Sequence, residues 1–195
     1  MSANLVIADF DDTLIKVDSF QTILKKERWF LKPSILFCGF NIIRYKGSKK
    51  EYQARSAMKI ELLKLYQQLP DTKKKYYISY FQSQLNQEVI ESINEKEPTQ
   101  VIIASASEEE LIKEVLKDKL PLHLVIANRM EDIQQKNFHT CYGKEKIRRF
   151  QQEFTNYKDY KIFVYTDSYS DQPLMDIAQE VYLVKKGEML HVKTN

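Results

Sequence analysis

The sequence has few glycines and cysteines and no long hydrophobic run. Only four glycines occur in 195 residues. Two of them, Gly39 and Gly47, fall in the stretch 16–97, which otherwise has the apolar spacing of helices. The two cysteines, Cys38 and Cys141, are far apart and lack the close spacing of a metal or redox motif. We therefore expect free thiols and a reducing compartment.

The most apolar window covers residues 29–43, and its longest uncharged run, Pro33 to Ile43, is 11 residues long. A membrane-spanning helix needs roughly 18–20 apolar residues. The run therefore predicts a helix that is either buried or lies on a membrane surface. No signal peptide precedes the first apolar strand, which favours a cytoplasmic location.

Charge is unevenly distributed along the chain, although the net charge is only +3. Residues 16–97 contain 16 Lys and Arg against 9 Asp and Glu, whereas the remainder is acidic. A basic segment over an acidic remainder would attract an anionic substrate. The alternative is that these charges only solvate helix surfaces, and the sequence does not decide between the two.

The chain begins with a short apolar run that leads into acidic side chains. Residues 5–8 are apolar and partly β-branched, which predicts a buried strand, and Asp9, Asp11 and Asp12 follow it. Carboxylates crowded at a strand end repel one another unless a cation or hydrogen bonds compensate them. Asp9 and Asp11 are two residues apart and point to the same side of an extended backbone. This arrangement suits Mg²⁺ and a phosphate, and a solvated acidic turn is the alternative.

Strands and helices alternate after the helical stretch 16–97. We predict further strands at residues 100–104, 122–127, 161–165 and 181–184. Ser107 and Glu110 have the spacing of a capping box, so we expect Ser107 to begin a helix. Residues 128–143 look like a turn-rich excursion, either a hairpin or a loose loop.

This pattern predicts an α/β fold, a doubly wound parallel β-sheet with a site at the carboxyl ends of its strands. Residues 1–15 and 98–195 would form the core domain. Residues 16–97 would form an α-helical cap inserted after the first strand, useful only if it folds back over the strand ends.

Polar side chains occur where four successive elements begin or end. In chain order they are Asp9, Asp11 and Thr13; Ser105; Lys146; and Asp167 with Asp171. These four loops resemble the four motifs of the haloacid dehalogenase (HAD) superfamily of phosphohydrolases. The helical insertion between the first two motifs resembles the cap of subclass IB, which contains phosphoserine phosphatases and phosphatidylglycerophosphate phosphatases. Lys146 matches the third motif best, and Lys144 is the alternative.

The resemblance implies a phosphatase that acts in two steps. Asp9 would attack phosphorus and form an aspartyl-phosphate. Asp11 would protonate the leaving oxygen and later take a proton from water, which requires a raised pKa. Lys146 and Ser105 would stabilise the phosphate oxygens, and Thr13 would help to orient them.

The resemblance also implies Mg²⁺ as cofactor. The carboxylates of Asp9 and Asp167 and the backbone carbonyl of Asp11 would bind it. Asp171 would orient the lysine of the third motif or a metal-bound water. Asp18, at the entrance to the cap, is a candidate for substrate contact.

Departures from the phosphoserine phosphatase pattern argue against phosphoserine as substrate. The chain has Ser105-Ala106-Ser107 where Ser-Gly-Gly is usual, Thr166-Asp167-Ser168 where Gly-Asp-Gly is usual, and Asp12 in place of a common Gly. The phosphatase resemblance as a whole leads us to expect a small phosphorylated metabolite as the substrate.

Other interpretations stay open at this stage. One is a peripheral lipid phosphate phosphatase similar to phosphatidylglycerophosphate phosphatases, which would contact a membrane through residues 29–43. Others are a phosphotransferase and a catalytically idle module that binds anions or RNA. No nucleic-acid-binding motif occurs, so no nucleic acid partner is expected. The sequence does not determine the oligomeric state.

Overall fold

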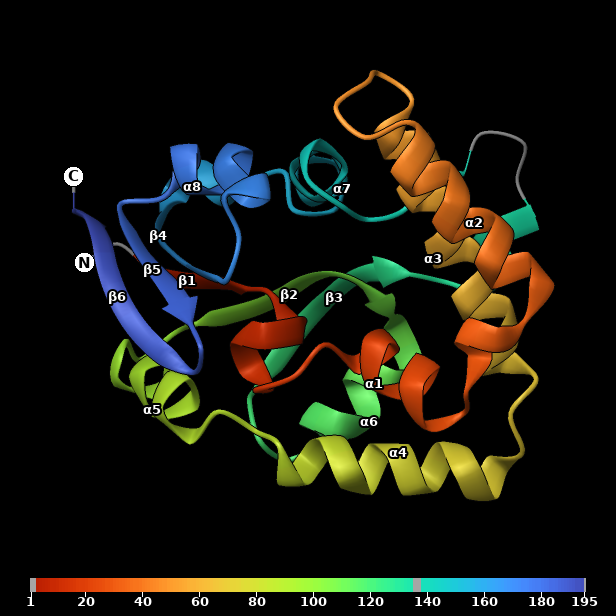
Figure 1. The fold of residues 1–195 in the computed structure, drawn as a ribbon. Coiled ribbons are helices and arrows are strands. Elements are labelled where there is room, and N and C mark those ends of the chain that lie inside the picture. Colours follow the sequence, from red (N-terminus) through yellow and green to blue (C-terminus); the bar gives the residue numbers. More distant parts are fainter. Residues whose placement is uncertain (1–2, 135–137, 195) are drawn as a thin grey trace.

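A computed structural model describes residues 3–134 and 138–194 and contains a six-stranded sheet flanked by helices (Figure 1). The strand order is β3-β2-β1-β4-β5-β6. Neighbouring strands among the first five are parallel, and β6 is antiparallel to β5. The strands are β1 Ala3–Ala8, β2 Gln100–Glu108, β3 Leu122–Asn128, β4 Tyr160–Thr166, β5 Glu180–Lys185 and β6 Glu188–Thr194. The predicted fold class is confirmed.

Strand β1 lies in the middle of the sheet and places the acidic motif at its switch point. Ala8 pairs with Ile103 of β2 on one side and with Tyr165 of β4 on the other. The chain therefore continues to β2 and β3 on one side of β1, and later to β4 and β5 on the other. In such sheets the crevice for ligands opens at the carboxyl ends of the strands where the order reverses. Asp9 follows β1 directly at this crevice.

Both faces of the sheet are covered, as the continuous apolar character of β1 requires. Successive side chains point to opposite faces, so Val6 and Ala8 enter one core, while Leu5 and Ile7 enter the other. The first core is completed by the inserted helices and α6 (Glu109–Leu116). The second core is completed by α7 (Lys144–Glu153) and α8 (Gln172–Ile177).

The insertion between β1 and β2 is helical, as its apolar spacing predicts. It begins with a short π-type turn, η1 (Phe10–Leu14), which carries the acidic motif. The elements that follow are α1 Ser19–Lys26, η2 Trp29–Leu31, α2 Pro33–Arg44, α3 Glu51–Gln67, α4 Asp71–Ser83 and α5 Gln87–Glu95. Within the described residues, no helix is both long enough and apolar enough to cross a bilayer.

The inserted helices do not all lie above the strand ends. Val89 and Ile93 of α5 are fully buried in the same core as Val6 and Val101 of the sheet. Ser92 of α5 also shares a buried 3.0 Å hydrogen bond with the hydroxyl of Tyr165 on β4. Helix α5 is thus a covering layer of the sheet, whereas α2 and α3 lie beyond the strand ends (Figure 1). The division into two domains stays a prediction.

The structure adds one strand that the sequence analysis did not predict. A turn with positive φ at Lys186 (54°) and Gly187 (86°) reverses the chain after β5. It leads into β6, which completes a hairpin on the edge of the sheet. Met189 of β6 packs against the core, but Leu190 and Val192 are about half exposed, so this edge strand lacks the buried pattern of the other five.

The excursion at 128–143 contains a short 3₁₀ turn, η3 (Glu131–Gln134), before the chain returns to α7. Residues 135–137 lie outside the described residues. The choice between a hairpin and a loose loop for this segment is therefore not decided over its full length.

Candidate active site

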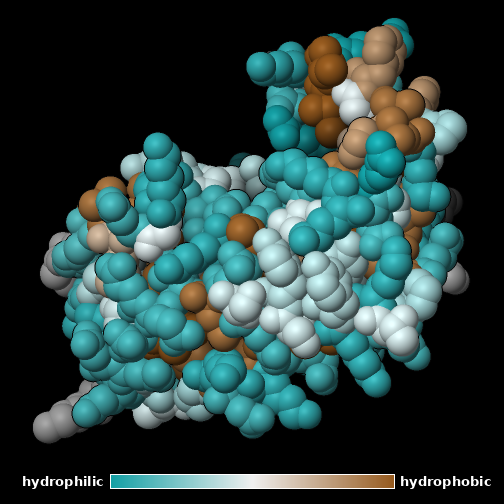
Figure 2. All heavy atoms as spheres, turned by 60° about the horizontal axis from the view of Figure 1, so that its bottom comes forward, coloured by the Kyte–Doolittle hydropathy of each residue, from teal (hydrophilic) through white to brown (hydrophobic). Residues whose placement is uncertain are grey.

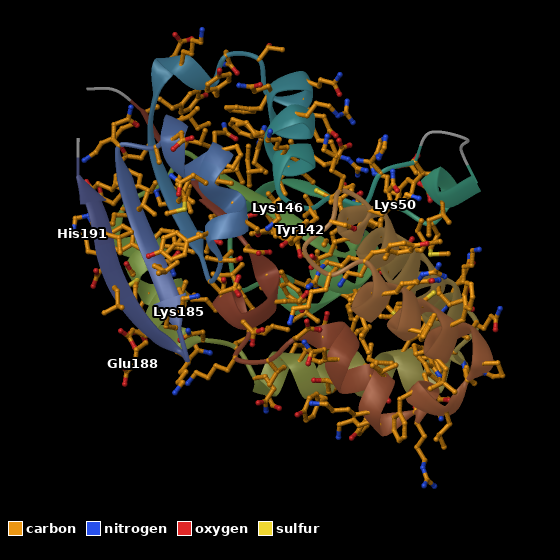
Figure 3. The ribbon with its side chains drawn as sticks, turned by 45° about the horizontal axis from the view of Figure 1, so that its top comes forward. Lys50, Tyr142, Lys146, Lys185, Glu188 and His191 are labelled. Atoms are coloured by element: carbon orange, nitrogen blue, oxygen red, sulfur yellow. The ribbon has the colours of Figure 1, made fainter. Side chains whose placement is uncertain are left out.

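The carboxyl edge of the sheet borders a pocket of about 340 Å³ beneath the inserted helices. Figure 3 shows Lys146 and Tyr142 between the strands and these helices. The strand side of the pocket is lined by Asp9, Asp11, Asp12, Ser105, Ala106, Thr140, Tyr142, Lys146, Asp167, Ser168 and Ser170. The side of the inserted helices is lined by Asp18, Ile42, Tyr52, Arg55, Ser56, Met58, Lys59 and Leu62. Residues predicted from all four loops are thus brought to one pocket.

The centre of the site is a buried lysine between two carboxylates. The Lys146 Nζ donates to Asp9 Oδ2 and to Asp171 Oδ2, each at 2.7 Å. Thr166 Oγ1 donates to the same Asp171 oxygen at 2.9 Å. Burial lowers the pKa of a lysine, but the two carboxylates outweigh it, so the pKa of Lys146 lies above its ordinary value. Lys146 therefore stays charged and attracts an anion.

The start of α7 explains why Lys146 reaches the site and Lys144 does not. Gly143 precedes the helix with a φ of 56°, a conformation that favours glycine. Lys146, in the first helical turn, then points inward to Asp9, while Lys144 is exposed. A lysine at a helix start opposes the helix dipole. Here the carboxylates of Asp9 and Asp171 compensate for it.

Asp11 is held by hydrogen bonds from two serines. The backbone N–H of Ser19 donates to Asp11 Oδ1 at 2.7 Å. The Ser107 hydroxyl donates to Asp11 Oδ2, and the hydroxyls of Ser19 and Ser107 lie 3.0 Å apart. Burial and the charge of Asp18 raise the pKa of Asp11, although Lys59 and the two serines oppose the shift. A raised pKa is what a general acid near neutral pH requires.

The predicted capping box at Ser107 is wrong. Strand β2 runs to Glu108 instead of ending near Ala104, because after an irregularity it pairs with β3 again, Glu108 opposite Asn128. Helix α6 begins at Glu109, and the carboxylate of Glu108 caps it by accepting a 2.6 Å hydrogen bond from the Leu111 N–H. Ser107 is thereby free to bind Asp11. The spacing of Ser107 and Glu110 is a local pattern, and the pairing of β2 with β3 moves the start of the helix to Glu109.

Ser105, Thr13 and Asp18 take different positions. Ser105 is buried at the pocket, and its hydroxyl accepts a 3.1 Å hydrogen bond from the Ser107 N–H. Thr13 is buried behind the acidic motif, and its hydroxyl has no partner among the described residues. Asp18 lines the pocket and also caps α1, accepting from the Gln21 N–H at 2.7 Å. Asp18 therefore has a structural role as a helix cap and is also accessible to a ligand in the pocket.

The remaining aspartates give the pocket an excess of negative charge. Asp12 and Asp167 line it together with Asp9 and Asp11. Burial and the nearby Asp9 raise the pKa of Asp167 to about 7, and Lys146 opposes this only in part. A hard divalent cation such as Mg²⁺ binds oxygen ligands, and several carboxylates in one pocket provide both the oxygens and the negative charge.

Asp9 and Asp167 with the backbone carbonyl of Asp11 therefore suit Mg²⁺ by donor type and charge. In residues 3–134 and 138–194, no three His, Cys, Asp or Glu side chains converge tightly enough to form a metal cluster by themselves. The predicted Mg²⁺ ligands are two side-chain carboxylates and one backbone carbonyl, so they do not form a cluster of three such side chains.

Helix α3 supplies pocket residues that the sequence analysis did not rank. Tyr52, Arg55 and Lys59 line the pocket. The Tyr52 hydroxyl donates to the Thr140 carbonyl at 3.4 Å, and Thr140 donates to the Ser56 hydroxyl at 3.2 Å. These polar residues repeat at three to four positions, which places them on one helix face. That spacing was the available signal, but the stronger apolar stripe of the same helix obscured it.

The family follows from the sequence and the fold together. The model of the haloacid dehalogenase-like hydrolases matches residues 6–176, so the chain belongs to this family. It is therefore a hydrolase of the HAD class, and the expected superfamily is confirmed. No curated protein sequence matches the chain significantly.

Solved structures share the fold at low sequence identity. A Bordetella pertussis protein of unknown function is 15% identical, with 93% of this chain and 89% of that chain covered and a TM-score of 0.67. A phosphoserine phosphohydrolase-like protein from Francisella tularensis is 20% identical, with 91% and 85% covered and a TM-score of 0.55. A substrate-bound phosphoserine phosphatase is 16% identical, with 93% and 85% covered and a TM-score of 0.53.

Proposed function

We propose that the protein is a Mg²⁺-dependent phosphomonoester hydrolase that acts through an aspartyl-phosphate on Asp9. The observation that carries this proposal is the contact of the Asp9 carboxylate with the Lys146 ammonium at 2.7 Å, in a pocket that also holds Asp11. A carboxylate nucleophile, a fixed cation and a second carboxyl with a raised pKa are the groups that phosphoryl transfer to an aspartate needs.

Asp9 and Asp11 would share the bond changes. An Asp9 oxygen forms a bond to phosphorus while the bond from phosphorus to the leaving oxygen breaks, and Asp11 gives its proton to that oxygen. Water then attacks the phosphorus of the aspartyl-phosphate and Asp11 takes a proton from the water, while the bond from phosphorus to the Asp9 oxygen breaks, which restores the Asp9 carboxylate and frees phosphate. The hydrogen bonds from Ser19 and Ser107 orient Asp11 for both proton transfers.

Lys146 would bind the phosphate oxygens and limit charge repulsion with Asp9. Its second partner, Asp171, keeps the ammonium in place when the contact with Asp9 is exchanged for one with the substrate. Ser105 lies at the same edge, and its hydroxyl would donate a hydrogen bond to a phosphate oxygen. Mg²⁺ held by Asp9, Asp167 and the Asp11 carbonyl would supply positive charge. This charge would reduce the repulsion between the Asp9 carboxylate and the substrate phosphate.

The pocket suits a small phosphorylated metabolite in volume and in charge. Arg55 and Lys59 add positive charge on the helix side, where the leaving group of the substrate would lie. Two of the similar structures are described as a phosphoserine phosphatase and a phosphoserine phosphohydrolase-like protein. Phosphoserine therefore belongs in a substrate panel, although the residues around Ser105 and Asp167 depart from that pattern.

The test is hydrolysis of an aryl phosphate by the purified protein, with Mg²⁺ and with EDTA. We expect activity only with Mg²⁺, and a loss of at least about a thousandfold in Asp9→Asn because the nucleophile is removed. Asp159→Asn changes an exposed aspartate just before the amino end of β4, opposite the strand end that borders the pocket, and as the matched control it should retain full activity. Equal activity of Asp9→Asn and the control would contradict the proposal.

A phosphotransferase would use the same residues, so the fate of the phosphoryl group must be measured as well. Hydrolysis in the presence of glycerol should release inorganic phosphate and aryl alcohol in equal amounts. Less phosphate than alcohol would mean that the group passes to the added acceptor.

A further inference from the structure

Helix α2 carries an exposed hydrophobic face that the fold leaves uncovered. Leu36, Phe37, Phe40 and Ile43 are exposed by 59%, 67%, 60% and 75%. Their spacing places them on one side of the helix, while Ile35 is buried. Figure 2 shows hydrophobic side chains gathered on the part of the molecule that projects at the upper right. We call these four side chains the α2 face.

A cluster of this kind needs an explanation, because exposed side chains of this size normally occur singly. Contiguous apolar patches rimmed by polar residues mark surfaces that bind a partner or a membrane. The helix packs against α3, so α2 is folded without any partner on its outer face. The face is therefore available for binding.

The charges around α2 indicate the kind of partner. Between Glu27 and Glu51 the sequence contains six basic residues and no acidic residue. All six side chains are exposed, and within the described part of the chain none of them forms a salt bridge. These residues are Arg28, Lys32, Arg44, Lys46, Lys49 and Lys50.

This combination favours an anionic bilayer over a second copy of the chain. In a symmetric dimer the same patch meets itself, so the basic residues of the two copies would repel one another. At a membrane surface, the apolar side chains of an interfacial helix enter the acyl boundary, and Lys and Arg contact anionic headgroups. Each basic residue near such a surface strengthens binding.

We propose that α2 and the basic loop that follows it form a docking surface for an anionic membrane. Leu36, Phe37, Phe40 and Ile43 would enter the interface, and Arg44, Lys46, Lys49 and Lys50 would lie over the headgroups. Ile42, the neighbour of Ile43, lines the catalytic pocket. Docking therefore brings the pocket close to the bilayer surface.

The experiment is cosedimentation of the full chain with vesicles of phosphatidylglycerol and phosphatidylcholine, and with vesicles of phosphatidylcholine alone. We expect binding to the anionic vesicles, with affinity falling as salt is raised. Phe37→Ser with Phe40→Ser should weaken binding at least about tenfold, because each side chain loses its apolar contact with the acyl region. The matched control is Leu190→Ser with Val192→Ser, on the distant strand β6, where the side chains are 52% and 45% exposed. This control should bind as the unmodified protein does.

The contribution of the basic residues to vesicle binding is tested with a second pair of variants. Lys46→Gln, Lys49→Gln and Lys50→Gln together should reduce binding to the anionic vesicles by about tenfold or more. Lys117→Gln, Lys119→Gln and Lys158→Gln, three exposed lysines outside the insertion, should leave it unchanged. If both triple variants weaken binding equally, only overall charge matters and the proposed surface is refuted.

Two further outcomes would overturn the proposal. One is the absence of binding to anionic vesicles at low salt. The other is a lipid-free dimer, seen by sedimentation velocity, that Phe37→Ser with Phe40→Ser dissociates, since a second copy would then cover the face. Hydrolysis of the soluble aryl phosphate is measured on the same samples, so that failure of docking and failure of the proposed reaction are distinguished.

Discussion

At the scale of single residues, the site depends on side chains whose roles the local sequence does not reveal. Ser107 looks like a helix cap in the sequence, but in the structure it donates to Asp11. Together with Ser19 it links the second strand to the start of the insertion through the carboxyl that would move protons. Orientation of Asp11 is therefore shared between the core and the insertion.

Ser107→Ala should lower the kcat for aryl phosphate hydrolysis by roughly tenfold and change KM little. A hydrogen bond to a charged group contributes about 1.5–3 kcal/mol, and its loss lets Asp11 leave its orientation. Steady-state kinetics beside Ser83→Ala, an exposed serine on α4, would measure the effect. An unchanged kcat would show that Ser19 alone positions Asp11.

Asp167→Asn should stabilise the metal-free protein at alkaline pH. The pKa of Asp167 is raised to about 7 in the folded protein, so its ionisation weakens folding as pH rises from about 4 towards 7. Because the side chain is partly solvated, the gain should be about 1–2 kcal/mol at pH 8 and should vanish below about pH 4.

Urea unfolding in EDTA at several pH values would measure this difference, with Asp159→Asn as the control. Added Mg²⁺ should raise the stability of the unmodified protein more than that of Asp167→Asn, because binding to the folded state shifts the equilibrium. An equal gain in both proteins would argue against Asp167 as a ligand.

At the scale of elements, the inserted helices divide into those that cover the sheet and those that face outward. Helix α5 places Val89 and Ile93 in the core of the sheet. Helix α2 instead leaves four large side chains exposed. Only three of the nine residues of α5 are apolar, whereas most residues of α2 are, so hydrophobicity alone would predict the opposite arrangement.

Ile93→Ala should therefore lower the free energy of unfolding by about 2–5 kcal/mol, since it leaves a cavity in the core. Ile43→Ala, on the exposed face of α2, should change it by no more than about 0.5 kcal/mol. Urea denaturation would measure the free energy of unfolding of each variant. The two values can be compared directly if the m-values are equal. A small effect of Ile93→Ala would mean that α5 is only loosely attached to the sheet.

At the scale of the whole molecule, the insertion and the sheet share one hydrophobic core. Trp29, near the start of the insertion, is buried in the same cluster as Val6 of β1 and Phe163 of β4. Leu63 of α3 belongs to it as well. A continuous core couples the folding of its parts.

We therefore expect one cooperative unfolding transition. Trp29 is the only tryptophan in the chain, so its fluorescence reports on the insertion, while far-UV circular dichroism reports on all helices and strands. The two probes should have the same midpoint in urea. Separate midpoints would instead support residues 16–97 as an independently folding domain.

The order of the elements and the chemistry of the four loops could be predicted from the sequence, because both depend on local patterns. Buried parallel strands are continuous apolar runs, and residues 5–8 and 162–165 show this clearly. Strand β6 was missed because its few apolar residues, Met189, Leu190 and Val192, form neither a continuous apolar run nor a strict alternation, and two of them stay about half exposed. The cytoplasmic location and the absence of a nucleic acid partner stay predictions.

By itself, the sequence determined that Asp9, Ser105 and Asp167 each follow an apolar run of a strand, and hence that they meet at one edge of a parallel sheet. Only the tertiary structure decided that Lys146 and not Lys144 contacts Asp9, that Ser107 binds Asp11, and which inserted helix keeps an exposed face. The physical reason is the distance along the chain over which each interaction acts. Strand alternation acts between neighbours in the chain, whereas pairing of distant carboxylates, hydroxyls and helices depends on which surfaces the packed sheet brings together.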